Sequence, residues 1–422
     1  MQGWALAAQQ LGAQVSGSDR DDSPALASLR EEGIDARAGH DAANVPAGDD
    51  VEVVYSTAIP ENNPELEVAR QRGLRVMPRA ELLAELTALR RTIAVAGAHG
   101  KTTTSSMVAH VLLAAGMDPG YLIGGSLGTT GRNAAWGSGE WLVVEADESD
   151  RSLLSLDVDV AVLTNVELDH HATYGSLEEL EAVFAEFLAR APEAVIANEP
   201  ALLALRGDAP VVAYDPGPVE TASGRPRFRW RGQEVELSVP GRHNAWNAAA
   251  ALEAARLAGV GEAKAAAAIS SFSGAGRRFE DLGRSQSGAR VVDDYAHHPT
   301  EVVAAIAAAR SFEPERLVAV FQPHLFSRTR ELAGRFGEAL AGADMAVVVD
   351  VYRAREDPAD FPGVSGELVA QAAREAGAPS VEWIPAMGDA ELRLAELLAP
   401  GDLCLVMGAG DIRTLGENLV PD

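Results

Sequence analysis

The chain has 422 residues, of which 47% are hydrophobic, and it carries a formal net charge of −27 at pH 7. This length exceeds a single hydrophobic core, so two or three domains are expected. The acidic balance argues against nucleic acid as a partner, because phosphate backbones are bound by basic surfaces. No apolar run approaches the roughly 18 residues of a membrane helix, and no signal-peptide pattern is present. With a single cysteine, Cys404, no disulfide can form within the chain, and a cytoplasmic location is predicted.

Residues 1–90 show the alternating pattern of an α/β unit, although its first expected element is missing. Helices are predicted at 5–11 and 24–32, and strands at 14–17 and 51–56. Dinucleotide-type folds carry a glycine-rich turn after their first strand. This chain begins at Met1 already in a helix pattern. The first strand and its glycine-rich turn are therefore expected to be absent.

The next segment, residues 91–287, opens with a phosphate-binding pattern. An apolar strand at 92–96 runs into Gly97-Ala98-His99-Gly100-Lys101-Thr102-Thr103, and a helix follows. A glycine turn between a strand and a helix exposes N–H groups at the positive end of the helix dipole, which cradles polyphosphate. Lys101 would reach the outer phosphates, and the Thr102 hydroxyl would meet Mg²⁺. The alternative is a glycine-rich turn without function, but a Gly-Lys-Thr-Thr set in this position favours the phosphate loop.

Two further strands of this segment run into acidic residues. The strand at 141–146 carries Glu145 near its end, where an unpaired carboxylate would be costly to bury, so a cation is its natural partner. Glu148 and Asp150, which follow, fit a solvated acidic loop. The strand at 160–164 leads to Asp169-His170-His171. Oxygen and imidazole ligands suit Mg²⁺ or Mn²⁺, and zinc is less favoured because adjacent histidines point apart.

The segment ends with two polar motifs around a long alanine-rich helix. His243, Asn244 and Asn247 lie at the start of that helix, and the two asparagines share a face where their amides could pair with an adenine edge. Capping by Asn244 is the structural alternative. Arg278, in a glycine-rich linker, could clamp a transferring phosphoryl group, with plain surface charge as the alternative.

Residues 288–422 form another alternating unit, with strands predicted near 290–293, 317–321, 346–350 and 403–407. Two of these strands are followed by loops that contain histidine and other polar groups, Asp293 to Thr300 and Phe321 to Arg330. Two such loops in one domain, beside a phosphate-loop domain, suggest a substrate site between domains.

Together these motifs resemble the Mur ligase family over essentially the whole chain. The likeness rests on the combination Gly-Ala-His-Gly-Lys-Thr-Thr, Glu-Ala-Asp-Glu-Ser-Asp, Asp-His, Gly-Arg-His-Asn, Gly-Arg-Arg-Phe, Asp-Asp-Tyr-Ala-His-His-Pro and Gly-Ala-Gly-Asp. It implies an α/β chain of three domains. These are a UDP-sugar-binding Rossmann-like domain at 1–90, a central ATP-binding P-loop domain at 91–287, and a C-terminal amino-acid-binding Rossmann-like domain at 288–422.

The resemblance also implies roles for single residues. The magnesium (or manganese) ligands are Thr102, Glu145 and His170. ATP is held by Gly97, Ala98, His99, Gly100, Lys101, Thr102, Thr103, His243, Asn244, Asn247, Arg278 and Asp294. The other substrates are held by Tyr55, Ser56, Thr57, Tyr295, His297, His324 and Arg328. The residues implied in catalysis are Lys101, Glu145, His170, Arg278 and His297.

The implied reaction joins L-alanine to the carboxylate of UDP-N-acetylmuramate through an acyl phosphate, and it uses ATP and Mg²⁺. The protein is expected to be a monomer or a weak homodimer. Alternatives are a ligase that recycles a tripeptide onto the same nucleotide sugar, a phosphate-loop ATPase or kinase, and a truncated non-catalytic nucleotide binder. The segments Gly241–Asn244 and Phe321–His324 favour alanine addition. Several branches of the family carry a lysine in the helix that corresponds to residues 177–188. This chain has none there, and the alanine-adding branch is similar in lacking it. Leu325 stands where an arginine is common.

Overall fold

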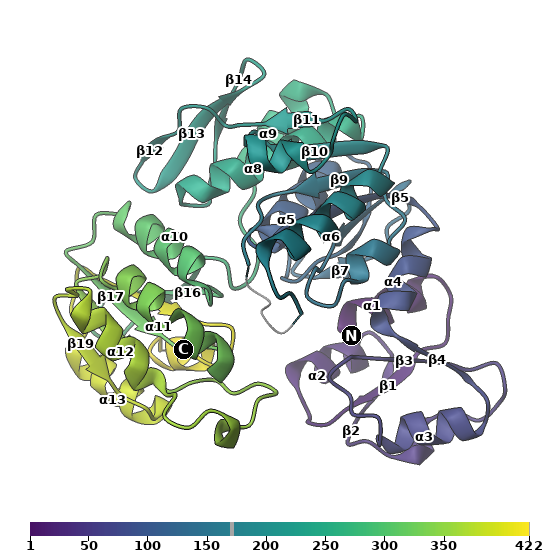
Figure 1. Cartoon of the computed structure of the whole chain (residues 1–422), viewed down its shortest axis with the longest axis horizontal. Helices are drawn as coiled ribbons and strands as arrows, with labels where there is room; N and C mark the ends of the chain where they lie inside the picture. The colour runs from purple at the N-terminus through teal and green to yellow at the C-terminus, as the bar shows by residue number, and fades with distance from the viewer. Residues whose placement is uncertain (169–172, 422) are drawn as a thin grey trace. The chain divides into compact units, whose positions relative to one another are not determined.

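The structure of the chain is a computed structural model that describes residues 1–168 and 173–421. It divides into two compact units (Figure 1). The first unit contains Met1–Asp215 and Ala250–Ala268, and the second contains Pro216–Ala249 and Ile269–Asp422. Both are α/β, as the alternating sequence pattern predicts. No helix among the described residues is long and apolar enough to cross a membrane.

The N-terminal part of the first unit contains two separate pairs of parallel strands. β1 (Ser16–Asp19) pairs with β2 (Asp35–Ala38), and β3 (Glu52–Tyr55) pairs with β4 (Arg75–Pro78). The helices of this part are α1 (Gln2–Gln10), α2 (Pro24–Glu31), the 3₁₀ turn η1 (Ala42–Asn44), α3 (Pro64–Gln71) and α4 (Arg79–Thr87). Ser23 and Asn63 cap α2 and α3 by accepting backbone N–H bonds, so both helices begin where the sequence supplies a side-chain acceptor.

A seven-stranded sheet forms the rest of the first unit, and β5 lies at its centre. All neighbouring strands are parallel except β6 and β7. In sheet order the strands are β11 (Val212–Tyr214), β10 (Glu193–Ala197), β9 (Val160–Leu163), β5 (Arg91–Ala96), β8 (Trp141–Glu145), β6 (Gly120–Leu122) and β7 (Ala134–Ala135). The central strands are almost completely buried, as expected for a parallel sheet covered on both faces. Loops that follow β5, β8 and β9 therefore meet at one edge.

Six helical segments complete the described residues of this part of the chain. They are α5 (Lys101–Ala114), η2 (Ser152–Ser155), α6 (Leu177–Arg190), α7 (Pro200–Ala204), α8 (Arg242–Leu257) and α9 (Glu262–Ser270). Helix α5 begins directly after the turn that follows β5 and packs against β5 and β8. Helices α8 and α9 contribute residues to both units.

The second unit is built on a six-stranded sheet and carries an antiparallel three-stranded ribbon of β12 (Glu220–Ala222), β13 (Arg225–Trp230) and β14 (Gln233–Glu236). The six strands, in sheet order, are β15 (Glu280–Arg284), β16 (Arg290–Asp294), β20 (Asp402–Met407), β17 (Arg316–Phe321), β18 (Met345–Val348) and β19 (Val381–Trp383). All pairings in it are parallel except that of β15 with β16.

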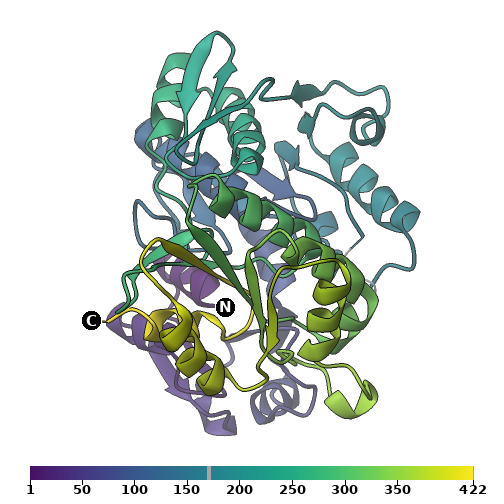
Figure 2. The same ribbon diagram turned by 90° about the vertical axis from the view of Figure 1, so that its left-hand side faces the viewer.

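Two hydrophobic cores hold this sheet between layers of helices (Figure 2). Alternate residues of β17 point to opposite faces, so Leu317 and Phe321 join one core while Val318 and Val320 join the other. The first core is covered by α10 (Pro299–Arg310), α11 (Phe326–Leu340) and α12 (Gly366–Glu375), and the second by α13 (Met387–Leu397) and α14 (Arg413–Asn418). A 3₁₀ turn, η3 (Pro358–Asp360), lies in the loop before α12. Cys404 is buried in β20, and burial raises the pKa of its thiol to about 12.

Candidate active site

The predicted phosphate loop has the backbone that its glycines permit. Gly97 has a φ of 130°, and Gly100, which precedes α5, has a φ of 81°. A Cβ on Gly97 would collide with the Oγ1 atom of Thr164 at the end of β9, so the loop passes that strand at a distance only glycine allows. Helix α5 then begins at Lys101, and its first N–H groups face the loop.

The end of β9 holds this loop in place. Asn165 accepts the His99 N–H at 2.9 Å and donates to the His99 carbonyl at 2.9 Å, and the Thr164 hydroxyl donates to the same carbonyl at 2.7 Å. The His99 ring lies 2.9 Å from Glu167 through Nε2. These hydrogen bonds within the protein hold the loop in shape, which lowers the entropy that phosphate binding must overcome.

Lys101 lies against its own loop and against Glu148. Its ammonium donates to the Gly97 carbonyl at 2.6 Å and to both carboxylate oxygens of Glu148 at 2.8 Å. Desolvation is the largest single influence on the pKa of Lys101 and lowers it, but the combined attraction of Glu148, Asp147 and Glu145 outweighs desolvation, so the pKa is raised and the amine is charged. Glu148 is 1% exposed. The interpretation of Glu148 as part of a solvated loop is therefore wrong, because burial beside a lysine gives it a partner that the sequence does not reveal.

Two of the three predicted metal ligands lie side by side. The Thr102 hydroxyl donates to a Glu145 carboxylate oxygen at 3.2 Å, and the other oxygen accepts the Gly124 N–H at 2.5 Å. A Cβ on Gly124 would lie 3.0 Å from both Thr102 Oγ1 and Glu145 Oε1, so glycine leaves this cradle open. Hard oxygen donors in such a cradle fit Mg²⁺. The third predicted ligand, His170, lies outside the described residues.

The predicted adenosine residues form a polar pair at the start of α8. Asn247 donates to the Asn244 amide oxygen at 3.0 Å, and Asn244 donates to the Pro240 carbonyl at 2.6 Å. Because α8 begins at Arg242, Asn244 lies inside the helix and is not its N-cap. The capping alternative is therefore wrong for Asn244. His243, which the sequence groups with these asparagines, is exposed on the same first turn.

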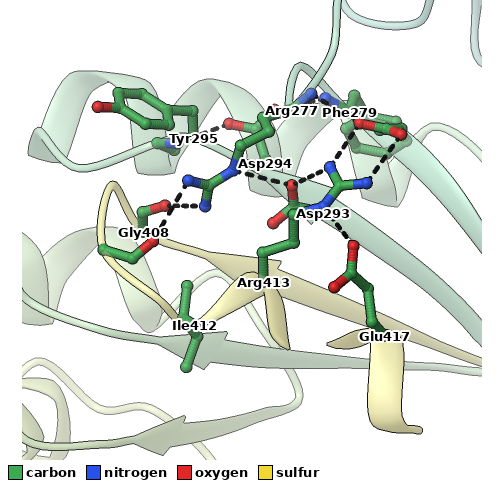
Figure 3. A network of polar contacts seen from close by, with 12 residues as sticks. Arg277, Phe279, Asp293, Asp294, Tyr295, Gly408, Ile412, Arg413 and Glu417 are labelled. Atoms are coloured by element: carbon green, nitrogen blue, oxygen red, sulfur yellow. Dashed lines mark hydrogen bonds and ion pairs between the residues drawn. The ribbon is translucent and has the colours of Figure 1, made fainter. Parts of the chain in front are cut away.

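A charged network in the second unit fixes the linker that carries Arg278 (Figure 3). Asp293, fully buried at the end of β16, accepts from Arg277 at 3.2 Å and from Arg413 at 3.1 Å. Arg413 also donates to Glu280 at 2.7 Å. Arg277 donates further to the Gly408 carbonyl at 2.8 Å. The network therefore joins the linker, the end of β16 and the loop after β20.

Next to this network, Asp294, Arg278 and Tyr295 lie close to one another. Asp294 accepts the backbone N–H groups of Phe279 and Ala296, both at 2.8 Å. Burial raises the pKa of Asp294 to about 6, and the charge of Arg278 opposes that shift. The Arg278 guanidinium lies 5.0 Å from the centre of the Tyr295 ring.

The predicted amino-acid residues form a row of rings at the carboxyl ends of β16 and β17. The His297 ring lies 5.3 Å from Tyr295 and 6.0 Å from His324. Arg328, which is 7% exposed, approaches His324 from one turn into α11 with a 3.4 Å contact. These four residues come from the two polar loops that the sequence singled out.

Sequence reasoning missed a further ring in this row, Tyr352. Its ring stacks on His324 at 5.7 Å with an interplanar angle of 18°. Backbone hydrogen bonds hold it there. The Tyr352 N–H donates to the Pro323 carbonyl at 2.8 Å, and the Tyr352 carbonyl accepts the Leu325 N–H at 3.0 Å. These bonds form a parallel bridge between His324 and Tyr352, just beyond the ends of β17 and β18. The available signal was its position just after a buried strand of the same sheet.

The predicted UDP-contacting residues lie where β3 ends. Tyr55 is the last residue of β3, and the hydroxyl of Ser56 accepts the Ala58 N–H at 3.3 Å in the turn that follows. Tyr55 and Ser56 are half-buried, and Thr57 is exposed. Ligands of open α/β sheets bind beyond the carboxyl ends of strands, so the position is suitable.

A second polar cluster, which the sequence did not indicate, lies beyond the ends of β1 and β2. The Ser18 hydroxyl donates to Glu65 at 2.7 Å and lies 3.1 Å from the Nδ1 atom of His40. Asn44 also donates to Glu65, at 2.8 Å. Its members are polar residues from four separate elements, which is why no local motif revealed it.

The charged network is expected to stabilise the second unit. In Asp293→Asn, Arg277 and Arg413 lose a buried counter-charge, so the local free energy of unfolding should fall by about 2–3 kcal/mol. Hydrogen exchange of the β16 and β20 amides would measure the loss. Asp281→Asn is the control, because Asp281 forms an exposed pair with Arg290 on the adjacent strand and should change stability little. Equal protection in both variants would contradict the role of Asp293.

Comparison with known proteins gives three family models that together match most of the chain. The Mur ligase family catalytic domain matches residues 1–91, the Mur ligase middle domain matches 95–255, and the Mur ligase glutamate ligase domain matches 277–410.

Relatives are similar over their full length. A UDP-N-acetylmuramate–L-alanine ligase of Acidithiobacillus ferrooxidans is 45% identical over 98% of this chain and 94% of its own. The enzyme of the same name from Rubrobacter xylanophilus is 45% identical over 100% and 97%. Among solved structures, the UDP-N-acetylmuramate–alanine ligase of Thermotoga maritima has a TM-score of 0.84 at 27% identity, covering 99% of this chain and 95% of that one. A murein peptide ligase of Psychrobacter arcticus has a TM-score of 0.70 at 24% identity, covering 100% and 97%, which shows the fold alone.

Proposed function

The chain belongs to the Mur ligase family, and we infer that it is an ATP-dependent ligase that joins L-alanine to UDP-N-acetylmuramate in peptidoglycan precursor synthesis. The observation that carries this inference is the 45% identity, over nearly the full length of both chains, to two ligases of that activity. ATP use is supported by the match of residues 95–255 to the Mur ligase middle domain. That use of ATP also supports the proposed cytoplasmic location.

The nucleotide site is proposed at the loop from Gly97 to Thr103. There the loop N–H groups and charged Lys101 would hold the outer phosphates, which gain negative charge as the phosphoryl group leaves. Thr102 and Glu145 would hold Mg²⁺ together with His170. A bound Mg²⁺ would supply further charge stabilisation at the phosphoryl oxygens. The hydrogen bond from Thr102 to Glu145 places both oxygen donors side by side and supports this assignment.

The acceptor amino acid is proposed to bind at the row of rings in the second unit. Buried Arg328 offers a guanidinium suited to the carboxylate of L-alanine. Tyr295, His297 and His324 would enclose the small side chain and the attacking amine, and Tyr352 would support His324 by stacking. Arg278 and Asp294 would contact phosphate or ribose.

The three domains are proposed to divide the substrates as the sequence suggests. Residues 1–90 would bind the UDP-sugar, with Tyr55, Ser56 and Thr57 at the UDP moiety. Residues 91–287 would bind ATP, with His243, Asn244 and Asn247 at adenosine, and residues 288–422 would bind the amino acid. A monomer or weak homodimer remains the expected state.

L-Alanine should be preferred over its D-isomer and over bulky amino acids. Glycine and serine should react with a lower kcat/KM, by roughly 10- to 200-fold at most, because one methyl group contributes only about 1–3 kcal/mol. Steady-state ligation assays with each amino acid would measure this, with UDP-N-acetylmuramate and ATP held at saturation. Equal turnover of a preformed tripeptide would instead identify a recycling ligase.

A further inference from the structure

The hydrogen-bonding capacity of Lys101 is taken up by acceptors of the protein itself. An ammonium group has three N–H donors and no acceptor. In this structure the amine contacts the Gly97 carbonyl at 2.6 Å and both carboxylate oxygens of Glu148 at 2.8 Å, with the Ala98 carbonyl at 3.4 Å. A phosphate oxygen can therefore accept a full hydrogen bond from Lys101 only if one of these acceptors loses its own hydrogen bond to the ammonium group.

Glu148 is held firmly in position. Its side chain is buried, and its backbone carbonyl accepts the hydroxyl of Tyr174 at 2.5 Å. The next carbonyl, that of Ser149, accepts the hydroxyl of Thr173 at 2.7 Å. The carboxylate thus occupies a fixed place opposite Lys101, where an anionic phosphate is expected to bind.

The local charge around Lys101 is negative. Glu148, Asp147 and Glu145 all act on the lysine electrostatically, and Asp147 also pairs with Arg79 at 3.6 Å, so three carboxylates lie near two cationic side chains. A nucleotide without metal brings further negative charge into this cluster. A nucleotide bound to Mg²⁺ brings two positive charges with it, and the cradle of Thr102 and Glu145 lies directly beside the loop.

We propose that Glu148 is an internal substitute for nucleotide phosphate, which holds Lys101 in the ligand-free protein and releases it only to a phosphate group that arrives with Mg²⁺. This inference rests on the proposed nucleotide site at residues 97–103. Glu148 acts through Lys101 and is a positioning residue. It makes the protein discriminate between free and metal-bound nucleotide, since only the latter compensates the carboxylates.

The test compares ADP binding with and without Mg²⁺. ADP is titrated calorimetrically into the full chain and into Glu148→Gln, once with chelator and once with saturating Mg²⁺. The variant should bind metal-free ADP at least roughly tenfold more tightly, because one like charge near the phosphates is gone. Binding of Mg·ADP should change by less than about threefold. The readout is the ratio of the dissociation constant for metal-free ADP to that for Mg·ADP. If Glu148→Gln only weakened the structure of the loop, both constants would change alike and the ratio would stay the same.

Two further variants separate charge from shape. Asp150→Asn removes an exposed carboxylate two residues along the same loop, which accepts the nearby Ser152 N–H at 3.0 Å, and should keep the wild-type ratio. Glu148→Asp keeps the charge in a shorter side chain and should keep metal-free binding weak.

Three outcomes would overturn the inference. Selective weakening of Mg·ADP binding in Glu148→Gln would make Glu148 a metal ligand instead. Equal weakening with and without metal would make it a structural support. Tight metal-free binding by Glu148→Asp would show that charge is not the cause. If the wild-type chain bound no ADP with or without Mg²⁺, the proposed nucleotide site itself would be wrong. Normal ADP binding together with one of the three outcomes above would contradict the role of Glu148 alone.

Discussion

Replacing Lys101 with alanine is expected to lower kcat for ligation by about 10²-fold or more. The charged amine lies in the loop where the outer phosphates are proposed to bind, so its contribution should grow as negative charge gathers on the transferring phosphoryl group. Single-turnover assays of acyl-phosphate formation, followed as ADP release, would measure the chemical step directly.

The structure imposes a specific control on that experiment. Lys101→Ala leaves the buried Glu148 carboxylate without its counter-charge, which can itself destabilise the loop. The double variant Lys101→Ala/Glu148→Gln removes both charges and should remain just as inactive while unfolding at close to the wild-type temperature. Lys264, the other lysine of the chain, is exposed and donates to the Ala115 carbonyl at 2.8 Å, so Lys264→Ala should keep full activity. A Lys101→Ala variant with half the wild-type rate would contradict the phosphate-loop assignment.

The Mur ligase family and its three-domain α/β fold were predicted from the sequence and are confirmed by the family models and full-length relatives. Strands buried on both faces read as continuous apolar runs, so β5, β8, β9 and β20 were placed to within about two residues. Short strands at or near sheet edges were missed, such as β11 and β19, which have three residues each and remain partly exposed. Such strands are defined by pairing with a neighbour and carry no pattern of their own.

The same division applies to the candidate site. The phosphate loop was predictable because its residues are contiguous, and their order between a strand and a helix is enough to indicate phosphate binding. Glu148 was misinterpreted because its partner, Lys101, is 47 residues away in the chain. Tyr352 was missed because it meets His324 only through the register of two parallel strands. Non-local pairing of this kind cannot be deduced from one sequence.

The proposed metal site also depends on such non-local contacts. Glu145, at the end of β8, faces Thr102 at the start of α5, and Gly124 after β6 completes the cradle. Glu145 also accepts the Ser105 hydroxyl at 3.4 Å, so its carboxylate is oriented before a cation arrives. An oriented carboxylate loses little conformational entropy when it binds a metal.

Glu145→Gln should therefore raise the Mg²⁺ concentration needed for half-maximal activity by roughly 10- to 100-fold, since a neutral amide is a far weaker ligand than a carboxylate. Gly124→Ala should act in the same direction, because its Cβ would enter the cradle 3.0 Å from Thr102 Oγ1. His170→Ala is expected to match Glu145→Gln if the histidine shares the ion. Glu140→Gln is the control, as Glu140 lies just before β8 with its side chain 64% exposed and pairs only loosely with Arg91. The measurement is a Mg²⁺ titration of the initial ligation rate at fixed ATP. If Glu145→Gln and His170→Ala both kept the wild-type midpoint, the two residues would not share a metal ion.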